Sequence, residues 1–290
     1  MDLSQFSRPV QMLWKNLSSC TLCPRQCGVN RLKGQNGYCG AEAQPIISSF
    51  GPHFGEESVL VGRGGSGTVF FTGCNLRCIY CQNYDISWNR RGEEISIVDL
   101  SKIFLHLQEA GCININLVTP THQIAAIAAA LETAKKDGLS VPVVYNTGGY
   151  DSFQTLRLLD GLVDIYMPDM KYADANIAAR LSDATDYPQV NQAAVLEMHR
   201  QVGDLQTVNG VATRGLLIRH LVLPADLAGS EQIFDFLAQQ VSTRTAIHVM
   251  DQYRPCFQID GNTDLNRQIS SEEWIRAVSL TKAKGLFLVK

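Results

Sequence analysis

The chain has 290 residues, 45% of them hydrophobic, and its 25 basic and 28 acidic residues give a net charge of −3. This composition suits one large α/β core, and a near-neutral charge without a Lys/Arg block excludes an extended nucleic-acid surface. No apolar run reaches the ~18–20 residues of a membrane span, and the first six residues lack the basic-then-apolar pattern of a signal peptide. The nine cysteines therefore indicate metal ligation in a reducing cytoplasm.

The first 60 residues are expected to form an irregular segment, and residues 61–290 the main domain. Four cysteines in this segment follow the pattern C-x2-C-x3-C-x11-C, namely Cys20, Cys23, Cys27 and Cys39. Four thiolates can close around Zn²⁺ or hold an iron–sulfur cluster, and a metal would order such a short, polar segment. Free reduced thiols are the alternative, and the spacing does not separate zinc from iron.

Two patterns precede the first strand of the main domain. Residues 62–67 spell G-x-G-x-x-G, but a dinucleotide site needs a strand before the motif and a helix after it. Here an apolar strand follows, so we interpret the motif as a turn. His53, Glu56 and Glu57 lie in the loop upstream, which is either a lid over the active-site rim or an ordinary solvated loop.

From residue 61 onward, short apolar runs alternate with amphipathic segments. Strands are predicted at 67–73, 112–118, 141–146, 163–168, 215–223, 245–250 and 286–289. Ser96 and Asp99 predict a capping box opening one helix, a second helix covers about 121–137, and Asp151 is expected to cap a third. Strand–helix alternation implies a parallel sheet, and six units predict a partial, TIM-like (β/α)6 barrel.

The strongest functional signal follows the first predicted strand. Cys74, Cys78 and Cys81 have the spacing C-x3-C-x2-C, directly after an apolar run at 68–71. A protein thiolate normally holds each iron of a [4Fe–4S] cluster, so three thiolates leave one iron open to another ligand. A zinc site with a remote fourth ligand is the alternative.

The unusual polar residues collect after the predicted strands. In barrels of parallel strands, catalytic groups gather at the carboxyl ends of the strands. In chain order these residues are Cys74, His122, Asn146, Thr147, Asp169, Lys171 and Arg219.

The three-cysteine motif resembles that of the radical S-adenosylmethionine (SAM) superfamily. Residues 163–171 resemble the fourth-strand segment of glycyl-radical-enzyme activases, typified by pyruvate formate-lyase activating enzyme. The N-terminal cysteine set and residues 118–122, 145–150 and 250–253 resemble the PflX-like branch of proteins similar to that enzyme. The resemblance implies that the open iron chelates SAM, which an electron from the cluster cleaves to a 5′-deoxyadenosyl radical that abstracts hydrogen from a substrate. A glycine in a partner protein, a small molecule or a peptide side chain all remain possible substrates.

The resemblance also implies which residues lie around SAM. Lys171 would meet the SAM carboxylate, with Asp169 and Met167 on the same strand face. Tyr80 would pack against the cluster and adenine. A structural ion pair is the alternative for Asp169 and Lys171, and a core aromatic the alternative for Tyr80.

Asp169, Asn146 and Thr147 would form a site for a monovalent cation beside SAM. Asn146 stands where the family usually has an acid, which weakens this site. The second strand also lacks the Gly-Gly-Glu that holds the SAM amino group in many members, so backbone carbonyls, Thr119, Thr121 or His122 would take that role. A lone histidine at a helix start is otherwise a cap or surface residue.

The last expectations concern the electron donor, the two remaining cysteines and the competing function. Clusters of this kind can lie as low as about −700 mV, below the roughly −220 to −320 mV of the glutathione pool, so a flavodoxin or ferredoxin donor is implied. Cys112 is expected in the core, and Cys256 is either a catalytic thiol or a core residue. The competing function is an iron–sulfur or zinc protein for electron transfer or structure, without radical catalysis.

Overall fold

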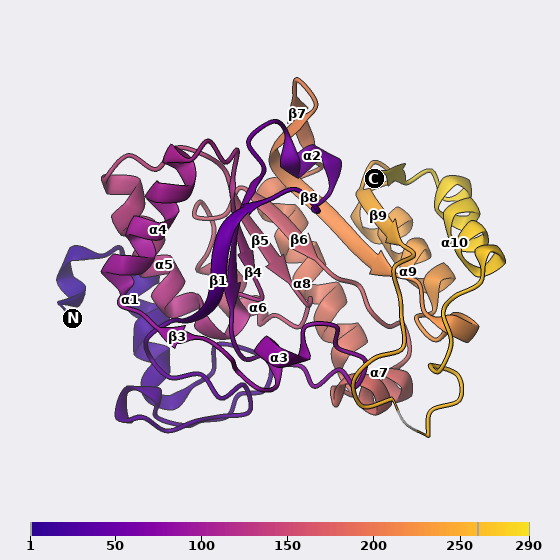
Figure 1. Cartoon of the computed structure of the whole chain (residues 1–290), viewed down its shortest axis with the longest axis horizontal. Coiled ribbons are helices and arrows are strands. Elements are labelled where there is room, and N and C mark those ends of the chain that lie inside the picture. Colours follow the sequence, from indigo (N-terminus) through magenta and orange to yellow (C-terminus); the bar gives the residue numbers. More distant parts are fainter. Residues whose placement is uncertain (1, 260, 290) are drawn as a thin grey trace.

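The computed structural model describes residues 2–259 and 261–289 and has a curved, mostly parallel sheet at its centre (Figure 1). The strand order is β10-β9-β8-β6-β5-β4-β2-β1-β3, and β7 pairs with β8. The strands are β1 (Ile46–His53), β2 (Ser66–Phe71), β3 (Glu93–Glu94), β4 (Ile115–Val118), β5 (Val143–Thr147), β6 (Ile165–Pro168), β7 (Gln206–Val208), β8 (Val211–Leu221), β9 (Ala246–Met250) and β10 (Phe287–Leu288). All pairs from β2 to β10 along this order are parallel, which confirms the predicted partial α/β barrel.

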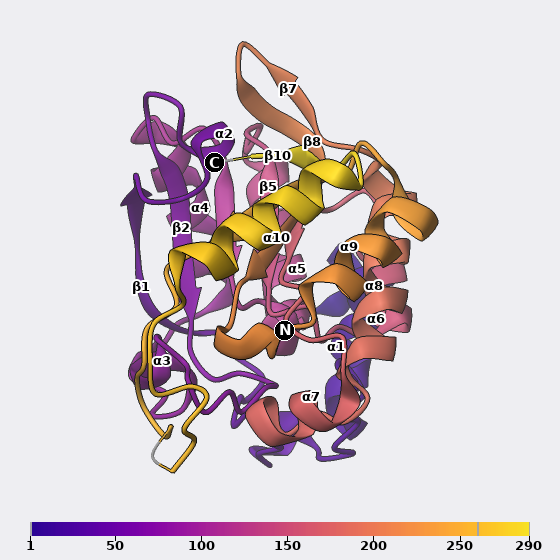
Figure 2. The same cartoon turned by 90° about the vertical axis from the view of Figure 1, so that its right-hand side faces the viewer.

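The helices lie along the outside of this sheet and at its two ends (Figures 1 and 2). They are α1 (Arg8–Lys15), α2 (Ser58–Val61), α3 (Tyr84–Ser87), α4 (Ile97–Glu109), α5 (Ile124–Lys136), α6 (Phe153–Arg157), α7 (Ala175–Ser182), α8 (Tyr187–Val202), α9 (Ser230–Phe236) and α10 (Ser271–Ala283). Strand residues such as Tyr145 and Tyr166 belong to the core shared with these helices, whereas Val144 and Met167 belong to a second apolar cluster inside the barrel. No described helix has the length and apolarity needed to cross a membrane.

The predicted helix starts are confirmed at one site and wrong at another. Ser96 caps α4 by accepting a hydrogen bond from the Asp99 N–H, as expected. The cap of α6 is Ser152, which accepts from the Thr155 N–H, and not Asp151. The Asp151 carboxylate is instead buried, and it accepts hydrogen bonds from three hydroxyl groups.

Strand β1 was not predicted, and it joins the N-terminal segment to the barrel. It pairs antiparallel with β2, with Phe50 opposite Val69, while α1 packs against α5. Ser48, Ser49, Gly51 and Pro52 hide the strand pattern of β1 in the sequence. The sheet therefore begins well before the division expected near residue 60.

The direction of β1 decides which end of the barrel its following loop closes. Because β1 is antiparallel to β2, residues 54–57 and α2 lie at the amino ends of the parallel strands, at the top of Figure 1. Glu57 is buried there, and its Oε1 lies 2.9 Å from Nδ1 of His248 on β9. The interpretation of this loop as a lid over the cysteine rim, at the opposite end, is therefore wrong.

Candidate active site

The cysteine triad lies on the loop after β2, close to α7 and at the carboxyl ends of the strands. The loop is fixed by backbone bonds from the N–H groups of Arg77 and Ile79 to carbonyls at the end of α7. Each sulfur also has a hydrogen-bond partner: Cys74 with the Leu76 N–H (3.4 Å), Cys78 with the Ser182 hydroxyl (3.0 Å) and Cys81 with the Ser87 hydroxyl (3.1 Å). Such contacts stabilise thiolate ligands of a metal cluster.

The chemistry of this donor set fits a [4Fe–4S] cluster. Burial raises the pKa of the Cys74 thiol to about 12, and metal coordination deprotonates such a thiol outright. In the described part of the chain, no three His, Cys, Asp or Glu side chains are close enough to share a single metal ion. Ligands of a cluster bind separate irons, so they do not need to converge on one point.

A chain of hydroxyl groups connects Cys78 to the aromatic residues around it. Ser182 lies 2.7 Å from the hydroxyl of Tyr172, which in turn contacts the hydroxyl of Tyr80. Tyr80 is buried and packs edge-on against Tyr253. The structure thus places Tyr80 beside the triad, linked through two hydroxyls to a candidate cluster ligand.

We expect Ser182→Ala to lower the reduction potential of a cluster held by the triad. In the wild type, the hydrogen bond from Ser182 to Cys78 stabilises the reduced cluster, which is more negative, more than the oxidised cluster. A net bond of about 1 kcal/mol corresponds to at most about 40 mV for one electron. Redox titration followed by electron paramagnetic resonance (EPR) measures the shift. Ser101→Ala, which removes a buried hydroxyl bonded within α4, is the control, and equal potentials in all three proteins would contradict the prediction.

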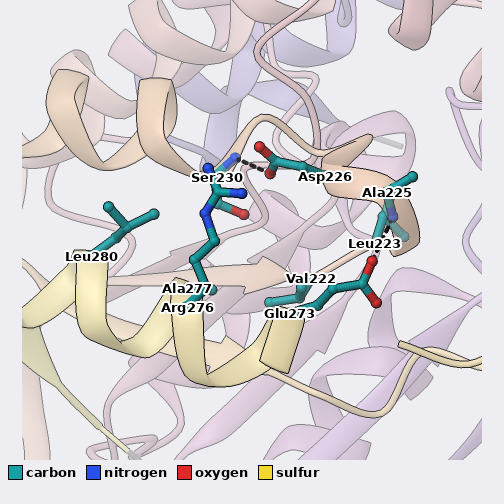
Figure 3. A pocket seen from close by; sticks show the side chains of 9 residues that line it. All are labelled: Val222, Leu223, Ala225, Asp226, Ser230, Glu273, Arg276, Ala277 and Leu280. Atoms are coloured by element: carbon teal, nitrogen blue, oxygen red, sulfur yellow. Dashed lines mark hydrogen bonds between the residues drawn. The ribbon is translucent and has the colours of Figure 1, made fainter. Parts of the chain in front are cut away.

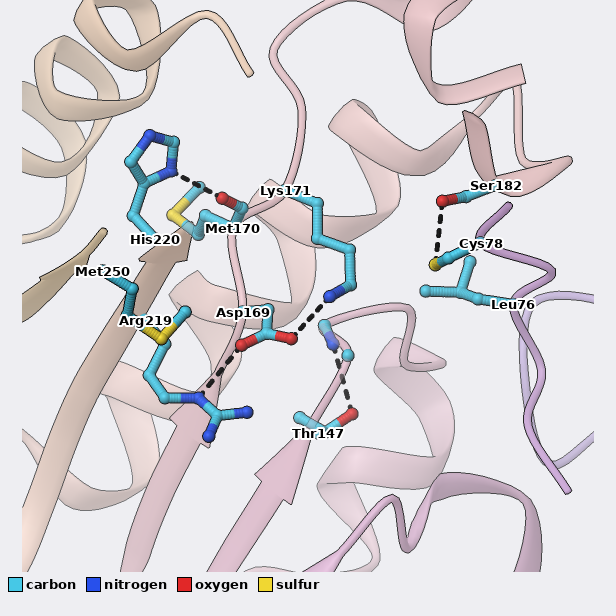
Figure 4. A network of polar contacts seen from close by, with 12 residues as sticks. Leu76, Cys78, Thr147, Asp169, Met170, Lys171, Ser182, Arg219, His220 and Met250 are labelled. Carbon is cyan, nitrogen blue, oxygen red and sulfur yellow. Dashed lines mark hydrogen bonds and ion pairs between the residues drawn. The ribbon is translucent and has the colours of Figure 1, made fainter. Parts of the chain in front are cut away.

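Three charged side chains meet beside the triad (Figure 4). Asp169 Oδ2 lies 2.6 Å from Lys171 Nζ, and its Oδ1 lies 3.0 Å from Nε of Arg219 on β8. Although burial opposes ionisation, Arg219 and Lys171 hold the pKa of Asp169 below its usual value. The Lys171 charge also lowers the pKa of the thiols of Cys74 and Cys78, so this ammonium lies near the triad.

The residues expected to hold a monovalent cation already make contacts within the protein. Both oxygens of Asp169 are occupied by protein cations, and Asn146 adds no negative charge. The Thr147 hydroxyl donates to Asp151 at 2.7 Å and accepts from the Gly149 N–H. Both of its hydrogen-bonding roles are therefore already filled within the protein. Met167 lies in the apolar cluster inside the barrel.

Among the residues after β4, Thr121 and His122 are buried within the protein, whereas Thr119 forms a turn at the rim. The Thr121 hydroxyl bonds Asp151 at 2.7 Å, and His122 is 1% exposed, so the expectation of a surface or capping histidine is wrong. Thr119 has a φ of 58°, a left-handed conformation that costs a β-branched residue about 1–3 kcal/mol. Its N–H donates to the Asn146 carbonyl (2.8 Å), which fixes this turn at the rim.

The two cysteines outside both sets do not belong to the group of charged residues beside the triad. Cys112 is buried in the main core, as expected. Cys256 donates to the carbonyl of Tyr80 at 3.2 Å, and therefore lies against the triad loop. Figure 3 shows a separate pocket between residues 222–230 and α10, where Glu273 accepts from the Ala225 N–H. That pocket contains none of the residues expected to bind a cofactor.

Residues 68–221 match the family model of the Radical SAM superfamily. This span runs from β2 to β8 and contains the triad, Asp169, Lys171 and Arg219. The chain belongs to the radical SAM superfamily. This radical SAM protein is also 32% identical over 286 residues to an uncharacterised protein of Methanocaldococcus jannaschii, covering 95% of this chain and 78% of that protein.

Two solved structures share its fold at low sequence identity. A radical SAM methyltransferase from Sphaerobacter thermophilus is 14% identical with a TM-score of 0.53, over 77% of this chain and 65% of that one. SuiB from Streptococcus suis, solved with bound SAM, is 12% identical with a TM-score of 0.53, over 74% and 47%. The chain thus spans less than two thirds of these proteins. Membership of this family implies a [4Fe–4S] cluster and SAM, and it supports a SAM-cleaving radical enzyme.

Proposed function

We propose that Cys74, Cys78 and Cys81 hold this cluster, and that the radical formed from SAM abstracts a hydrogen atom from a substrate in the barrel. When bound, the cluster would supply the electron that cleaves SAM. The observation that carries the proposal is the position of Lys171, which is paired with Asp169 and lies near the triad (Figure 4). An ammonium there suits the carboxylate of SAM, with Tyr80 beside it.

The closed end of the barrel supports entry of substrate from the cysteine rim. Glu57 and α2 occupy the opposite end. Inside, neither polar atom of the Asn116 amide has a hydrogen-bond partner in the described chain, and neither does Oε2 of Glu57. Buried polar atoms without partners are costly, so their presence favours a substrate that brings hydrogen-bonding groups.

We further propose a glycine in a partner protein as the substrate, which makes the chain an oxidoreductase of the glycyl-radical activase type. The support is the resemblance of residues 163–171 to such activases, together with a peptide's ability to satisfy the Asn116 amide. A flavodoxin or ferredoxin is the proposed electron donor, because the potential range of such clusters extends below that of cellular thiols.

The test is anaerobic. Protein reconstituted with iron and sulfide receives dithionite and SAM, and 5′-deoxyadenosine is measured by chromatography. We expect product from the wild type and from Cys112→Ala, which removes a cysteine outside both sets, and none from Cys78→Ala. A wild-type protein with a verified [4Fe–4S] cluster and no product, with or without candidate substrate proteins, contradicts radical catalysis and favours electron transfer.

The glycyl-radical part needs its own measurement. Candidate partner proteins are incubated with the reduced enzyme and SAM, and EPR is used to detect a carbon-centred radical in the partner. Replacing the partner's glycine with alanine should remove the signal. Formation of 5′-deoxyadenosine without any partner radical would retain SAM cleavage and reject a glycine substrate.

A further inference from the structure

The four N-terminal cysteines come together in the fold. Cys20, Cys23, Cys27 and Cys39 line one cavity between the N-terminal segment and the start of α5. They come from two stretches of chain, 20–27 and 37–40, whose ends fold back on themselves. The Cys20 N–H donates to the Val29 carbonyl (2.9 Å), and the Gly40 N–H donates to the Gly37 carbonyl (3.0 Å). None of the four takes part in a disulfide.

The backbone around these thiols is shaped for sulfur ligands. The Tyr38 N–H donates to Sγ of Cys27 at 3.4 Å. A Cβ at Gly37 would lie 3.0 Å from that same sulfur, which is why this close approach suits glycine. Backbone N–H groups directed at cysteine sulfur stabilise thiolate, the form that binds metals.

His122 gives an independent indication of a ligand in this cavity. It lines the cavity wall and is 1% exposed. Its Nε2 lies 2.7 Å from the Thr72 carbonyl, so Nε2 carries the proton and Nδ1 has a free lone pair. Nδ1 has no hydrogen-bond partner among the described residues. A histidine whose other N–H is held by a carbonyl is the form that metal sites use.

The charges around the cavity also require an anion. Arg31 is 3% exposed, and its guanidinium bonds the carbonyls of Glu42 and His122. Its Nη1 also lies 3.9 Å from Sγ of Cys20. A buried guanidinium bonded only to neutral groups is unfavourable. Arg25, a second cation that lines the same cavity, already has the Asp183 carboxylate 4.0 Å away, so the uncompensated charge is that of Arg31. Metal-bound thiolates would supply the missing negative charge.

We infer that Cys20, Cys23, Cys27 and Cys39 bind a second metal centre, separate from the triad. Four thiolates around one zinc ion lie about 3.8 Å apart, given a Zn–S distance of about 2.3 Å. No three metal-binding side chains in residues 2–259 and 261–289 are close enough to share one ion. We assign the centre as an iron–sulfur cluster, whose ligands bind separate irons, because all four cysteines line one cavity.

The two cysteine sets are neighbours, which affects the design of a test. A Cβ on Gly73, the residue before Cys74, would lie 2.6 Å from the Cys39 carbonyl and 3.2 Å from Nε2 of His122. Arg25 also donates to the Asn75 carbonyl at 2.9 Å, inside the triad loop. Damage to one set can disturb the other, so each set must be removed while the other is measured directly.

The experiment measures metal content in the full chain after the triad has been replaced by alanine at Cys74, Cys78 and Cys81. After anaerobic reconstitution, we expect about four iron and four sulfide ions per chain to remain. Adding Cys23→Ala and Cys39→Ala should remove them, whereas adding Cys112→Ala should not. This readout does not depend on SAM cleavage, so it stands or falls separately from the proposed function.

Zinc is measured in the same samples. One zinc per chain, lost with Cys23 and Cys39, sustains a second metal centre but overturns the iron–sulfur assignment. Neither metal, in a protein whose circular dichroism matches the wild type, overturns the inference. If the triad variant does not fold, Cys23→Ala with Cys39→Ala in the otherwise wild-type chain should halve the iron content. Unchanged iron with a loss of zinc overturns the iron–sulfur assignment, and unchanged iron with unchanged zinc overturns the inference.

Discussion

Asp169→Asn should lower the free energy of unfolding by about 3–5 kcal/mol, the cost of removing one partner from a buried ion pair. The carboxylate lies between Lys171 Nζ (2.6 Å) and Arg219 Nε (3.0 Å), and all three side chains are at most 20% exposed. An amide would leave two partly buried cations facing each other with no negative charge between them. Urea unfolding of iron-loaded proteins with matched cluster content measures the change.

The control is Asp174→Asn, at an exposed helix cap where asparagine serves equally well. The two variants should also differ in their pH dependence. The pKa of Asp169 is lowered and that of Lys171 is raised. The ion pair therefore stabilises the fold between about pH 4 and 10, and its contribution is lost below and above that range. In proteins without the cluster, the stability gap between wild type and Asp169→Asn should narrow as the pH falls below about 4, and a gap that does not narrow would contradict this account.

The sequence predicts the elements whose pattern is local. Seven apolar runs become the parallel strands β2, β4, β5, β6, β8, β9 and β10, because each run alone has the strand signature. The alternation along residues 165–171 also placed Asp169 and Lys171 on one face, and they form an ion pair. The three-cysteine spacing identifies the family because it lies within a single loop.

The contacts that complete the site are long-range, and no local pattern contains them. Ser182 reaches Cys78 across 104 positions, and Glu57 reaches His248 across 191. Arg219 was placed at the rim, but its bond to Asp169 depends on the pairing of β6 with β8. Burial of Glu57 follows from the direction of β1. The sequence does not predict this strand, because it contains Gly and Pro residues. A buried charge is recognised as such only once its partner is known.

Lys171→Met should weaken SAM binding about 10- to 150-fold, whereas Arg219→Met should leave it unchanged. Both cations bond the same carboxylate, so both variants lose one partner of Asp169. Their surroundings differ. The Lys171 charge acts on Cys74 and Cys78, and the Arg219 charge acts on Glu56 and Glu57 at the closed end. We therefore expect Lys171, and not Arg219, to bond the carboxylate of SAM, and a charged hydrogen bond is worth about 1.5–3 kcal/mol.

Equilibrium titration of SAM into the reconstituted, oxidised proteins separates these effects, because no turnover occurs without a reductant. Urea unfolding of the same samples should show both variants destabilised, since each leaves Asp169 with one cation. Arg219→Met thus controls for the loss of the ion pair, and the difference between the variants reports the contact with SAM. Equal loss of affinity in both variants would mean that the pair only shapes the rim, and would reject Lys171 as the group that binds the SAM carboxylate.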